Sequence, residues 1–371
     1  MISFRHLFAV IAVMIACTGC QGRAFNPNLR LERFLPNVSR RPDVLFTQTT
    51  DGKILALERI QPNQINPDMP PLIFIHSEGF NRNFWTVAGE RSIIHFFSRY
   101  GFDIWLLDLR GHGDSTKPEW YNDEDWDWTF DDYVHKDIPA AISFVQGQTR
   151  SRQVTLVGHG VGAMAIYGYL ELENFFDEVA NVILFSPPAF LSEFNESVSK
   201  AIGLARQLGK DDPLTLQFAL EKPEKLELFH EMYIAGSFIR TPIIRRLGLT
   251  AVDNISPRVI QQVLKWVENE DFLSSDLQLS YRVKLGLVRV PTLIISGAKD
   301  RVAPVGAVNY GFRSLTVSDR ALLVFGRDYG YIHDYSHLGL LLGDGAYDEV
   351  FPVVFEWIEA RTPGVQAWGR F

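Results

Sequence analysis

The chain has 371 residues, of which 46% are hydrophobic and 22% are charged. This length and composition suit one large α/β domain with an insertion, or two domains, and such a chain can bury a substantial core without disulfides. A net charge of −8, without a long run of lysine or arginine, argues against nucleic acid as a partner.

Residues 1–20 have the pattern of a cleaved export signal. A basic start is followed by an apolar run, residues 7–16, which is too short to span a bilayer as a stable helix. The signal ends in CTGC, residues 17–20, which resembles a bacterial lipobox, whose cysteine is lipidated after cleavage. We expect Cys20 to be the lipid attachment site. Cys17 is the alternative acceptor, and a plain cleaved signal is the simpler interpretation.

The cysteine count favours a lipid-anchored protein over a disulfide-bonded one. Both cysteines lie in the signal, so the mature chain cannot form an intrachain disulfide although export leads to an oxidising compartment. Residues 21–41, rich in Asn, Arg and Pro, are expected to form a tether. The sequence therefore predicts a bacterial cell-envelope protein, exported and anchored to a membrane on the periplasmic side.

Beyond the tether, short apolar runs alternate with helical patterns. Asp51 and Gly52 form a dipeptide typical of a tight turn, which predicts a hairpin between strands at 44–50 and 53–60. Thr129, followed three residues later by an aspartate, has the pattern of a capping box. Alternating strands and helices predict a mostly parallel central sheet with helices on both faces. The buried strands are expected at 71–76, 102–108, 152–158 and 181–186, and the helices near 91–100, 131–146 and 163–170.

Between residues 187 and 290 the pattern is helical only. Ser256 is the expected N-cap of one of these helices, because Pro257 follows it at the first helical position. The α/β alternation then resumes with strands at 291–297 and 321–326 and a helix at 349–360. We therefore predict that a core domain is interrupted by a helical cap, which would cover a site at the carboxyl edge of the sheet. The predicted segments are 42–186 and 291–371 for the core and 187–290 for the cap.

The strand at 152–158 runs into GHGVG, residues 158–162, and then into a helix. This is the glycine spacing and the context of a G-x-S-x-G nucleophile elbow, in which a serine lies on a sharp turn between strand and helix. In this chain Gly160 occupies the position of the serine. Asp300 follows the strand at 291–297 and His337 follows the last strand, which reproduces the chain order of an α/β-hydrolase triad.

Over residues 44–361 the chain resembles the α/β-hydrolases, in particular acid lipases and esterase-like members with a helical cap. DLRGHGDS (108–115) is similar to the D-x-R-G-x-G-x-S loop of that fold, and FIHSEGFNRNFW (74–85) is similar to its oxyanion loop. Residues 128–145 and 266–276 resemble segments of acid lipases and related lipid- or polyester-handling members. The resemblance implies an α/β-hydrolase fold, but this fold hosts many reactions.

The resemblance also implies roles for individual residues. Asp300 would orient the imidazole of His337, which would be the general base. The backbone N–H of Val161 and that of Ser77 or Glu78 would form the oxyanion hole. Glu78 stands where the family usually has an apolar residue, and its carboxylate would disfavour an oxyanion if it points inward. His333 lacks the H-L-G context of His337 and ranks below it, and His76, His112 and His159 are interpreted as scaffold or packing residues.

Glycine at position 160 removes the hydroxyl on which acyl-enzyme chemistry depends. Loss of a triad serine costs about a millionfold in kcat, or roughly 8 kcal/mol of barrier. One hypothesis is a vestigial member, a pseudoenzyme, that binds a small hydrophobic or ester-like ligand at the membrane. A second is a hydrolase of ester or lipid-like substrates, in which His337 and Asp300 activate a water or Glu78 participates. A purely structural envelope protein is the third.

No cofactor and no metal is expected. The acidic and aromatic run EWYNDEDWDW, residues 119–128, lacks the ligand spacing of an EF-hand loop. It is interpreted as the lead-in to a helix or as part of an entrance rim.

Overall fold

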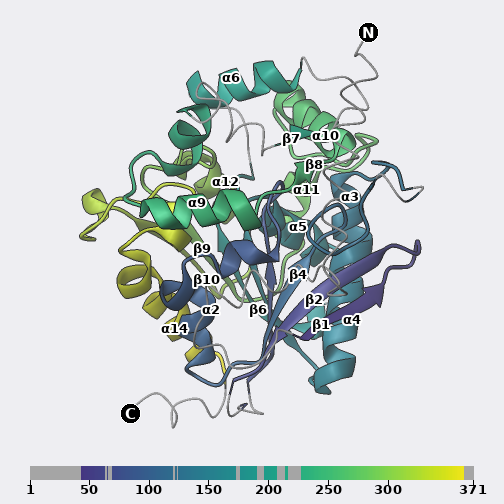
Figure 1. The fold of residues 1–371 in the computed structure, drawn as a ribbon, viewed down its shortest axis with the longest axis horizontal. Coiled ribbons are helices and arrows are strands. Elements are labelled where there is room, and N and C mark those ends of the chain that lie inside the picture. Colours follow the sequence, from purple (N-terminus) through teal and green to yellow (C-terminus); the bar gives the residue numbers. More distant parts are fainter. Residues whose placement is uncertain are drawn as a thin grey trace, which may run out of the picture. The chain divides into compact units, whose positions relative to one another are not determined.

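The structure is a computed structural model that describes residues 43–62, 65, 69–119, 122, 124–172, 176–189, 196–206, 214–215 and 227–362. These residues belong to one compact unit, which spans 42–371 (Figure 1). The predicted signal, the tether and the lipid attachment site Cys20 lie outside the described residues. Of the helices in the described part of the chain, none is long and apolar enough to cross a membrane.

An eight-stranded sheet runs through the centre of the unit, in the order β1-β2-β4-β3-β5-β6-β9-β10. The six strands β4, β3, β5, β6, β9 and β10, in their order across the sheet, pair in parallel. Strand β2 is antiparallel to both β1 and β4. This confirms the hairpin and the mostly parallel sheet that the sequence predicts. The strands are β1 (Asp43–Gln48), β2 (Ile54–Ile60), β3 (Leu72–Ile75), β4 (Ile104–Asp108), β5 (Val154–His159), β6 (Val179–Phe185), β9 (Thr292–Gly297) and β10 (Arg320–Phe325).

The central strands send alternate side chains into two separate cores, one on each face of the sheet. In β4, Trp105 and Leu107 enter one core, whereas Ile104 and Leu106 enter the other. This is the period of two that a pleated strand imposes, and both faces are apolar because both are covered by helices. The sequence therefore shows continuous apolar runs instead of an alternation of apolar and polar residues.

Helices cover both faces of the sheet, as predicted. Side chains of α4 (Ile138–Thr149) and α5 (Val161–Leu170) enter the first core, and those of α2 (Ile93–Ser98) and α14 (Phe351–Glu359) enter the second. Thr129 forms the expected capping box at the start of α3, which continues through η4 into α4. The other elements outside the predicted cap are η2 (Arg82–Trp85), η3 (Gly89–Arg91), α3 (Phe130–Asp132), η4 (Tyr133–Asp137), η5 (Phe176–Glu178), α12 (Val305–Ser314), η8 (Arg327–Tyr329), α13 (Gly339–Leu342) and η9 (Ala346–Val350).

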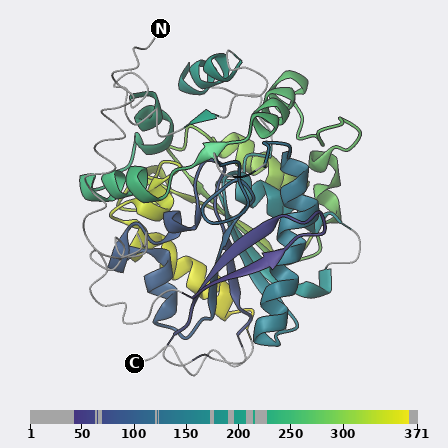
Figure 2. The same ribbon diagram turned by 45° about the vertical axis from the view of Figure 1, so that its right-hand side comes forward.

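The segment between β6 and β9 gathers at one end of the sheet (Figures 1 and 2). It is not helical only, because two short strands, β7 and β8, pair antiparallel within it. The helix α10 begins as predicted, with Ser256 as the N-cap residue and Pro257 at the first helical position. The Ser256 hydroxyl, however, donates to the carbonyl of Trp128, so it forms no side-chain capping bond to the helix. The described elements of this segment are α6 (Glu196–Ala205), β7 (Leu214–Thr215), η6 (His230–Ile234), α9 (Thr241–Thr250), β8 (Asn254–Ile255), α10 (Pro257–Asn269), α11 (Tyr281–Lys284) and η7 (Leu285–Leu287).

Candidate active site

Gly160 forms the sharp turn between β5 and α5 that the elbow motif predicts. Its backbone has φ 52° and ψ −118°, a conformation that glycine adopts freely and other residues adopt with strain. Its N–H donates to the carbonyl of Phe185, at the end of the neighbouring strand β6, at 2.9 Å. The elbow backbone is therefore intact although the serine is absent.

Gly162 lets the first turn of α5 pack directly against the end of β3. A Cβ at this position would lie 2.3 Å from the carbonyl oxygen of His76, a separation that side chains do not adopt. The final glycine of GHGVG is thus required by close packing of the backbone. This packing brings the start of α5 beside the loop that follows β3.

Asp300 and His337 meet at the carboxyl end of the sheet. One carboxylate oxygen of Asp300 accepts the N–H groups of Val302 and Ala303 at 2.9 and 2.8 Å. The other oxygen accepts Nδ1–H of His337 at 2.9 Å. Because Asp300 fixes Nδ1 as the protonated nitrogen, Nε2 of His337 is left as a basic site.

Nε2 of His337 faces the elbow. It lies 3.2 Å from the point that a Cβ of residue 160 would occupy. The ring is 1% exposed, and the carbonyl of His337 accepts Nε2–H of His159 at 3.2 Å. Burial and the neighbouring His337 hold the pKa of His159 well below its usual value, so His159 acts as a neutral packing residue behind the elbow.

The inserted segment fixes the loop that carries His337. The carbonyl of Tyr233, in η6, accepts the N–H of Leu338 and the hydroxyl of Ser336, both at 3.0 Å. The Tyr233 ring lies edge-on to the His337 ring, with 5.6 Å between centroids. Burial and the charge of Asp300 raise the pKa of Tyr233 to about 12, so its phenol stays neutral. The sequence motifs gave no signal for this residue.

The side chain of Ser77 enters the elbow from the loop after β3. Its Oγ accepts the N–H of Val161 at 3.2 Å. The same Oγ lies 2.5 Å from the point that a Cβ of residue 160 would occupy. The Ser77 hydroxyl therefore fills the space of the missing elbow side chain. Sequence reasoning assigned only the backbone of Ser77 to the site and missed its hydroxyl.

Glu78 directs its carboxylate behind the oxyanion loop. One oxygen lies 3.5 Å from Nε2 of the buried His112. Burial disfavours the charged form of His112, but the Glu78 carboxylate outweighs this and raises the pKa of His112. Burial and Glu78 also raise the pKa of Tyr133. The N–H of Glu78 has no acceptor among the described residues, which leaves it available as an oxyanion-hole donor. The N–H of Val161, the other predicted donor, is bound to Ser77 Oγ in this structure.

The DLRGHGDS loop is a scaffold held by ion pairs. A carboxylate oxygen of Asp108 accepts the N–H of Arg82 at 2.7 Å, and the Arg82 guanidinium pairs with the same carboxylate. Arg110 donates through Nε to Asp137 at 2.8 Å and through Nη1 to Asp51 at 2.8 Å. These buried contacts fix the loop beside the segment that carries Ser77 and Glu78.

Two other histidines have the non-catalytic positions that the sequence favours. His333 is half-exposed, and its Nδ1 lies 3.3 Å from the Glu349 carboxylate. His76 donates through Nδ1 to the carbonyl of Ser77 and accepts the N–H of Leu109 through Nε2. Burial and the neighbouring His112 lower the pKa of His76 to about 3. His76 is therefore neutral, and its two hydrogen bonds join the backbone at Ser77 to that at Leu109.

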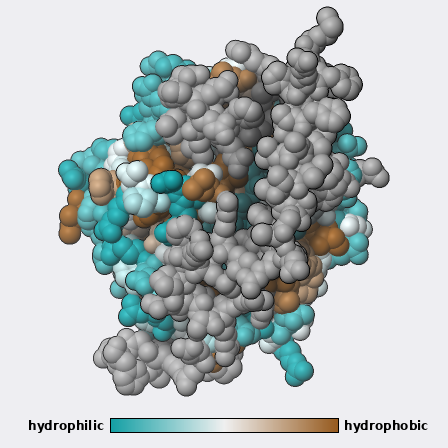
Figure 3. Space-filling view, viewed as in Figure 1, coloured by the Kyte–Doolittle hydropathy of each residue, from teal (hydrophilic) through white to brown (hydrophobic). Residues whose placement is uncertain are grey.

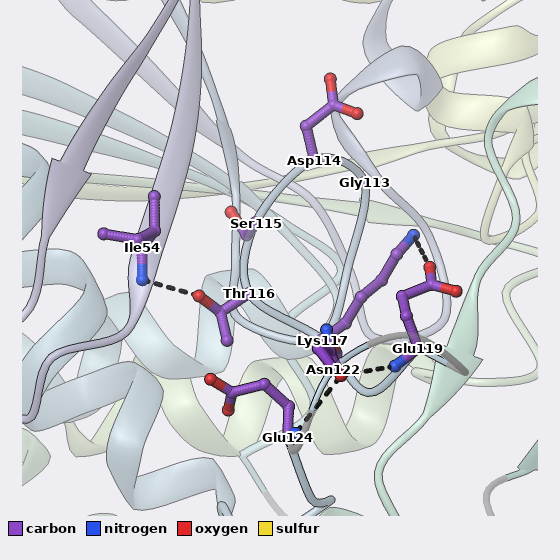
Figure 4. A pocket seen from close by; sticks show the side chains of 9 residues that line it. All are labelled: Ile54, Gly113, Asp114, Ser115, Thr116, Lys117, Glu119, Asn122 and Glu124. Carbon is purple, nitrogen blue, oxygen red and sulfur yellow. Dashed lines mark hydrogen bonds and ion pairs between the residues drawn. The ribbon is translucent and has the colours of Figure 1, made fainter.

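A polar pocket of about 420 Å³ lies on the loop after β4 (Figure 4). The Lys117 ammonium faces Glu119, and the Asn122 side chain accepts the N–H groups of Glu119 and Glu124. Its polar groups thus satisfy one another, and neither Gly160 nor His337 lines it. In the described residues, no group of three or more His, Cys, Asp or Glu side chains is arranged to hold a metal ion.

Comparisons with known proteins agree with this architecture. A family model described as alpha/beta hydrolase fold matches residues 70–330. The crystal structure of a bacterial membrane phospholipase A superposes with a TM-score of 0.59, covering 97% of this chain and 99% of that chain at 14% identity. At this identity the likeness concerns the fold.

Several curated relatives are lipases. Triacylglycerol lipase 1 of Arabidopsis thaliana is 21% identical over 350 residues, covering 85% of this chain and 86% of its own. Lipase lipl-3 of Caenorhabditis elegans is 28% identical over 181 residues, covering 45% and 44% of the two chains. The match covers less than half the length of lipl-3 and of several other curated lipases that the chain resembles.

Proposed function

Since the chain belongs to the alpha/beta hydrolase fold family, we propose that it is a hydrolase of lipase or esterase type. In this proposal His337 is the general base and Asp300 holds its imidazole in the productive tautomer. With Gly160 at the elbow, the attacking oxygen comes from elsewhere, either from a water molecule or from a side chain outside position 160.

The buried pair of Asp300 and His337 is the observation that carries this proposal. Both oxygens of Asp300 are hydrogen-bonded as in a triad acid. Two backbone N–H groups donate to one oxygen, and the imidazole of His337 donates to the other. Nε2 of His337, the unprotonated nitrogen, is directed at the elbow, where an ester carbonyl would bind, and accepts no hydrogen bond from another described residue. A histidine that served packing alone would not require its second nitrogen to face the elbow.

Lipid-like esters are the substrate class that we favour. The relatives named above are lipases, and the inserted segment exposes large apolar side chains. Phe238, just before α9, is 69% exposed and Leu249, within α9, is 72% exposed. Figure 3 shows apolar surface on the face where α9 lies. Such a surface suits contact with an aggregated or membrane-bound substrate.

The proposal includes a location at a membrane. The lipobox-like CTGC supports a lipid anchor on Cys20, which would be followed by the tether at 21–41. Incorporation of a palmitate analogue by expressing cells should persist in Cys17→Ala and disappear in Cys20→Ala. If incorporation is lost in Cys17→Ala instead, the attachment site is Cys17 and not Cys20. If the natural protein incorporates no palmitate analogue, the lipid anchor is excluded.

Ligand binding without hydrolysis is the second candidate function. It is favoured by one observation, the absence of a side chain at Gly160. In this case the site around Gly160 would hold a hydrophobic or ester-like molecule, and Asp300 and His337 would be retained for its recognition or for the fold. The two candidates differ in one measurable respect, which is turnover.

Hydrolysis of short and long p-nitrophenyl esters by the purified protein tests the proposal. We expect turnover, and a loss of about a hundredfold or more in kcat for His337→Ala. His333→Ala is the matched control, because His333 lies outside the site and pairs with Glu349; it should retain activity. No turnover by the natural protein, or equal turnover by His337→Ala, would overturn the hydrolase. Saturable binding of a fluorescent fatty acid without turnover would establish the second candidate.

A further inference from the structure

We propose that Ser77 is the nucleophile, supplied by the oxyanion loop in place of the absent elbow serine. The inference rests on the proposed hydrolase function and names the group that attacks the ester. It replaces the water-based mechanism by a covalent one, in which the acyl group is held on Ser77 Oγ.

The position of the Ser77 hydroxyl is the first argument. The point that a Cβ of residue 160 would occupy lies 2.5 Å from Ser77 Oγ and 3.2 Å from Nε2 of His337. The hydroxyl and the base thus flank the same point, which is where the side chain of an elbow serine would begin. The proposed reaction requires a rotation of the Ser77 side chain or of the imidazole that brings Oγ within hydrogen-bond distance of the base.

The hydrogen bonds of Ser77 are the second argument. Its Oγ accepts one N–H, that of Val161. In the described part of the chain, no acceptor receives its hydroxyl proton. A buried hydroxyl normally donates as well as accepts. Ser77 is 6% exposed, so its proton is free for transfer to Nε2 of His337.

The start of α5 provides the third argument. Val161 is the first residue of a ten-residue helix, and its N–H points at Ser77 Oγ. The partial positive charge of a helix N-terminus and a donated N–H both stabilise an alkoxide. The same environment that activates an elbow serine therefore acts on Ser77.

Gly160 and Ser77 are also complementary in space. Any side chain at position 160 would begin 2.5 Å from Ser77 Oγ and 3.1 Å from Ser77 Cβ, so the two cannot occupy the site together without displacement. Glycine at the elbow is therefore the condition for the Ser77 hydroxyl to enter. The absence of a serine at position 160 and the presence of the Ser77 hydroxyl in the elbow therefore depend on each other.

The chemistry balances with these groups alone. His337 Nε2 takes the hydroxyl proton of Ser77 while Oγ bonds to the ester carbonyl carbon. The tetrahedral oxyanion collapses, the bond to the alkoxy oxygen breaks, and Nε2 delivers its proton to the leaving alcohol. Water then adds to the acyl-serine, giving a proton to Nε2, and the acid leaves as that proton returns to Ser77. The N–H of Glu78, which has no acceptor among the described residues, would bind the oxyanion, while the N–H of Val161 donates to Ser77 Oγ.

Labelling with a fluorophosphonate and peptide mapping by mass spectrometry tests the assignment. We expect one adduct, on Ser77, which is absent from Ser77→Ala and from His337→Ala. Ser296→Ala is the matched control: Ser296 is buried in β9 and its hydroxyl has no partner in the described structure, so the label should persist. Thermal unfolding shows whether each variant is folded. Ester hydrolysis by Ser77→Ala should fall about a thousandfold or more.

The outcomes separate this inference from the function on which it rests. Turnover that depends on His337 but survives in folded Ser77→Ala would overturn Ser77 as nucleophile and leave the hydrolase standing with water as the attacking group. An adduct on another serine would also overturn it. Absence of both turnover and labelling would overturn the inference and the hydrolase together.

Discussion

At the scale of single residues, the meaning of Gly160 depends on Ser77. The sequence places Gly160 at the elbow and predicts loss of acyl-enzyme chemistry. A motif shows which residue stands at the elbow, but it does not show which side chains from elsewhere in the chain lie beside it. Ser77 and Val161 are far apart along the chain, and only their contact at 3.2 Å reveals that a hydroxyl is present in the elbow. Asp300 and His337 were predictable, because each follows a strand that the sequence identifies.

Moving the serine back to the elbow gives the residue-scale prediction. Gly160→Ser alone introduces a Cβ 2.5 Å from Ser77 Oγ, so we expect hydrolysis to fall by about tenfold or more, equivalent to about 1.4 kcal/mol of barrier. Adding Ser77→Gly frees the space, and the double variant should recover activity with the label at position 160. Ser77→Gly alone is the control and should be inactive.

Full activity of Gly160→Ser with the adduct still on Ser77 would show that the two side chains do not compete. A residue other than glycine at position 160 also carries backbone strain of about 1–3 kcal/mol. The unfolding free energy of each variant must therefore be measured beside its kinetics.

At the scale of elements, the strands and their helices were predictable and the inserted segment was not. Continuous apolar runs identify strands that are buried on both faces, and Gly or Pro residues mark their ends. In the insertion, tertiary contacts decide the local structure. Ser256 is the N-cap residue of α10, as its sequence context predicts, but its hydroxyl donates to the carbonyl of Trp128 and not to the helix. The pairing of β7 with β8 is two residues long, too short for a periodic pattern.

The end of α5 yields a prediction about pH. Glu171 is its C-cap and is 3% exposed, and neither carboxylate oxygen has a hydrogen-bond partner in the described structure. Burial raises the pKa of Glu171 to about 10, against which Lys284 acts only weakly. In the unfolded chain the carboxyl ionises near pH 4.3. Unfolding above that pH therefore releases a proton, and the stability contributed by the neutral carboxyl is lost as pH rises.

Glu171→Gln removes this linkage. Between about pH 6 and about pH 8 we expect the unfolding free energy of the variant, relative to that of the natural protein, to rise by about 1.4 kcal/mol per pH unit. Urea denaturation at several pH values measures the difference. Parallel stability curves for the two proteins would contradict the raised pKa.

At the scale of the whole molecule, the sheet holds the site and the segment between β6 and β9 contacts it. The sheet places Gly160, Asp300 and His337 at its carboxyl end, and the insertion binds the loop of His337 through Tyr233. The order of the motifs along the chain predicts that Gly160, Asp300 and His337 meet at one end of the sheet. It does not predict the contacts made by Tyr233 or Ser77, because these contacts join segments that share no sequence pattern.

The apolar surface near α9 gives the prediction at this scale. Replacing Phe238 and Leu249 by serine should lower hydrolysis of long-chain esters in vesicles several-fold, because apolar contact with the lipid phase is lost. Hydrolysis of a soluble short-chain ester should be unchanged. Val283→Ser is the control, since Val283 is 71% exposed but lies in α11. Equal loss on both substrates would mean that the site itself is perturbed.

Trapping of the acyl-enzyme during turnover tests the central claim most directly. The natural protein is mixed with a p-nitrophenyl ester, quenched in acid within the first turnovers and mapped by peptide mass spectrometry. We predict the acyl mass on the peptide that contains Ser77, at the Ser77 hydroxyl. Rapid hydrolysis with no acyl group on any serine, or with the acyl group on a different residue, would contradict the assignment of Ser77 as the nucleophile.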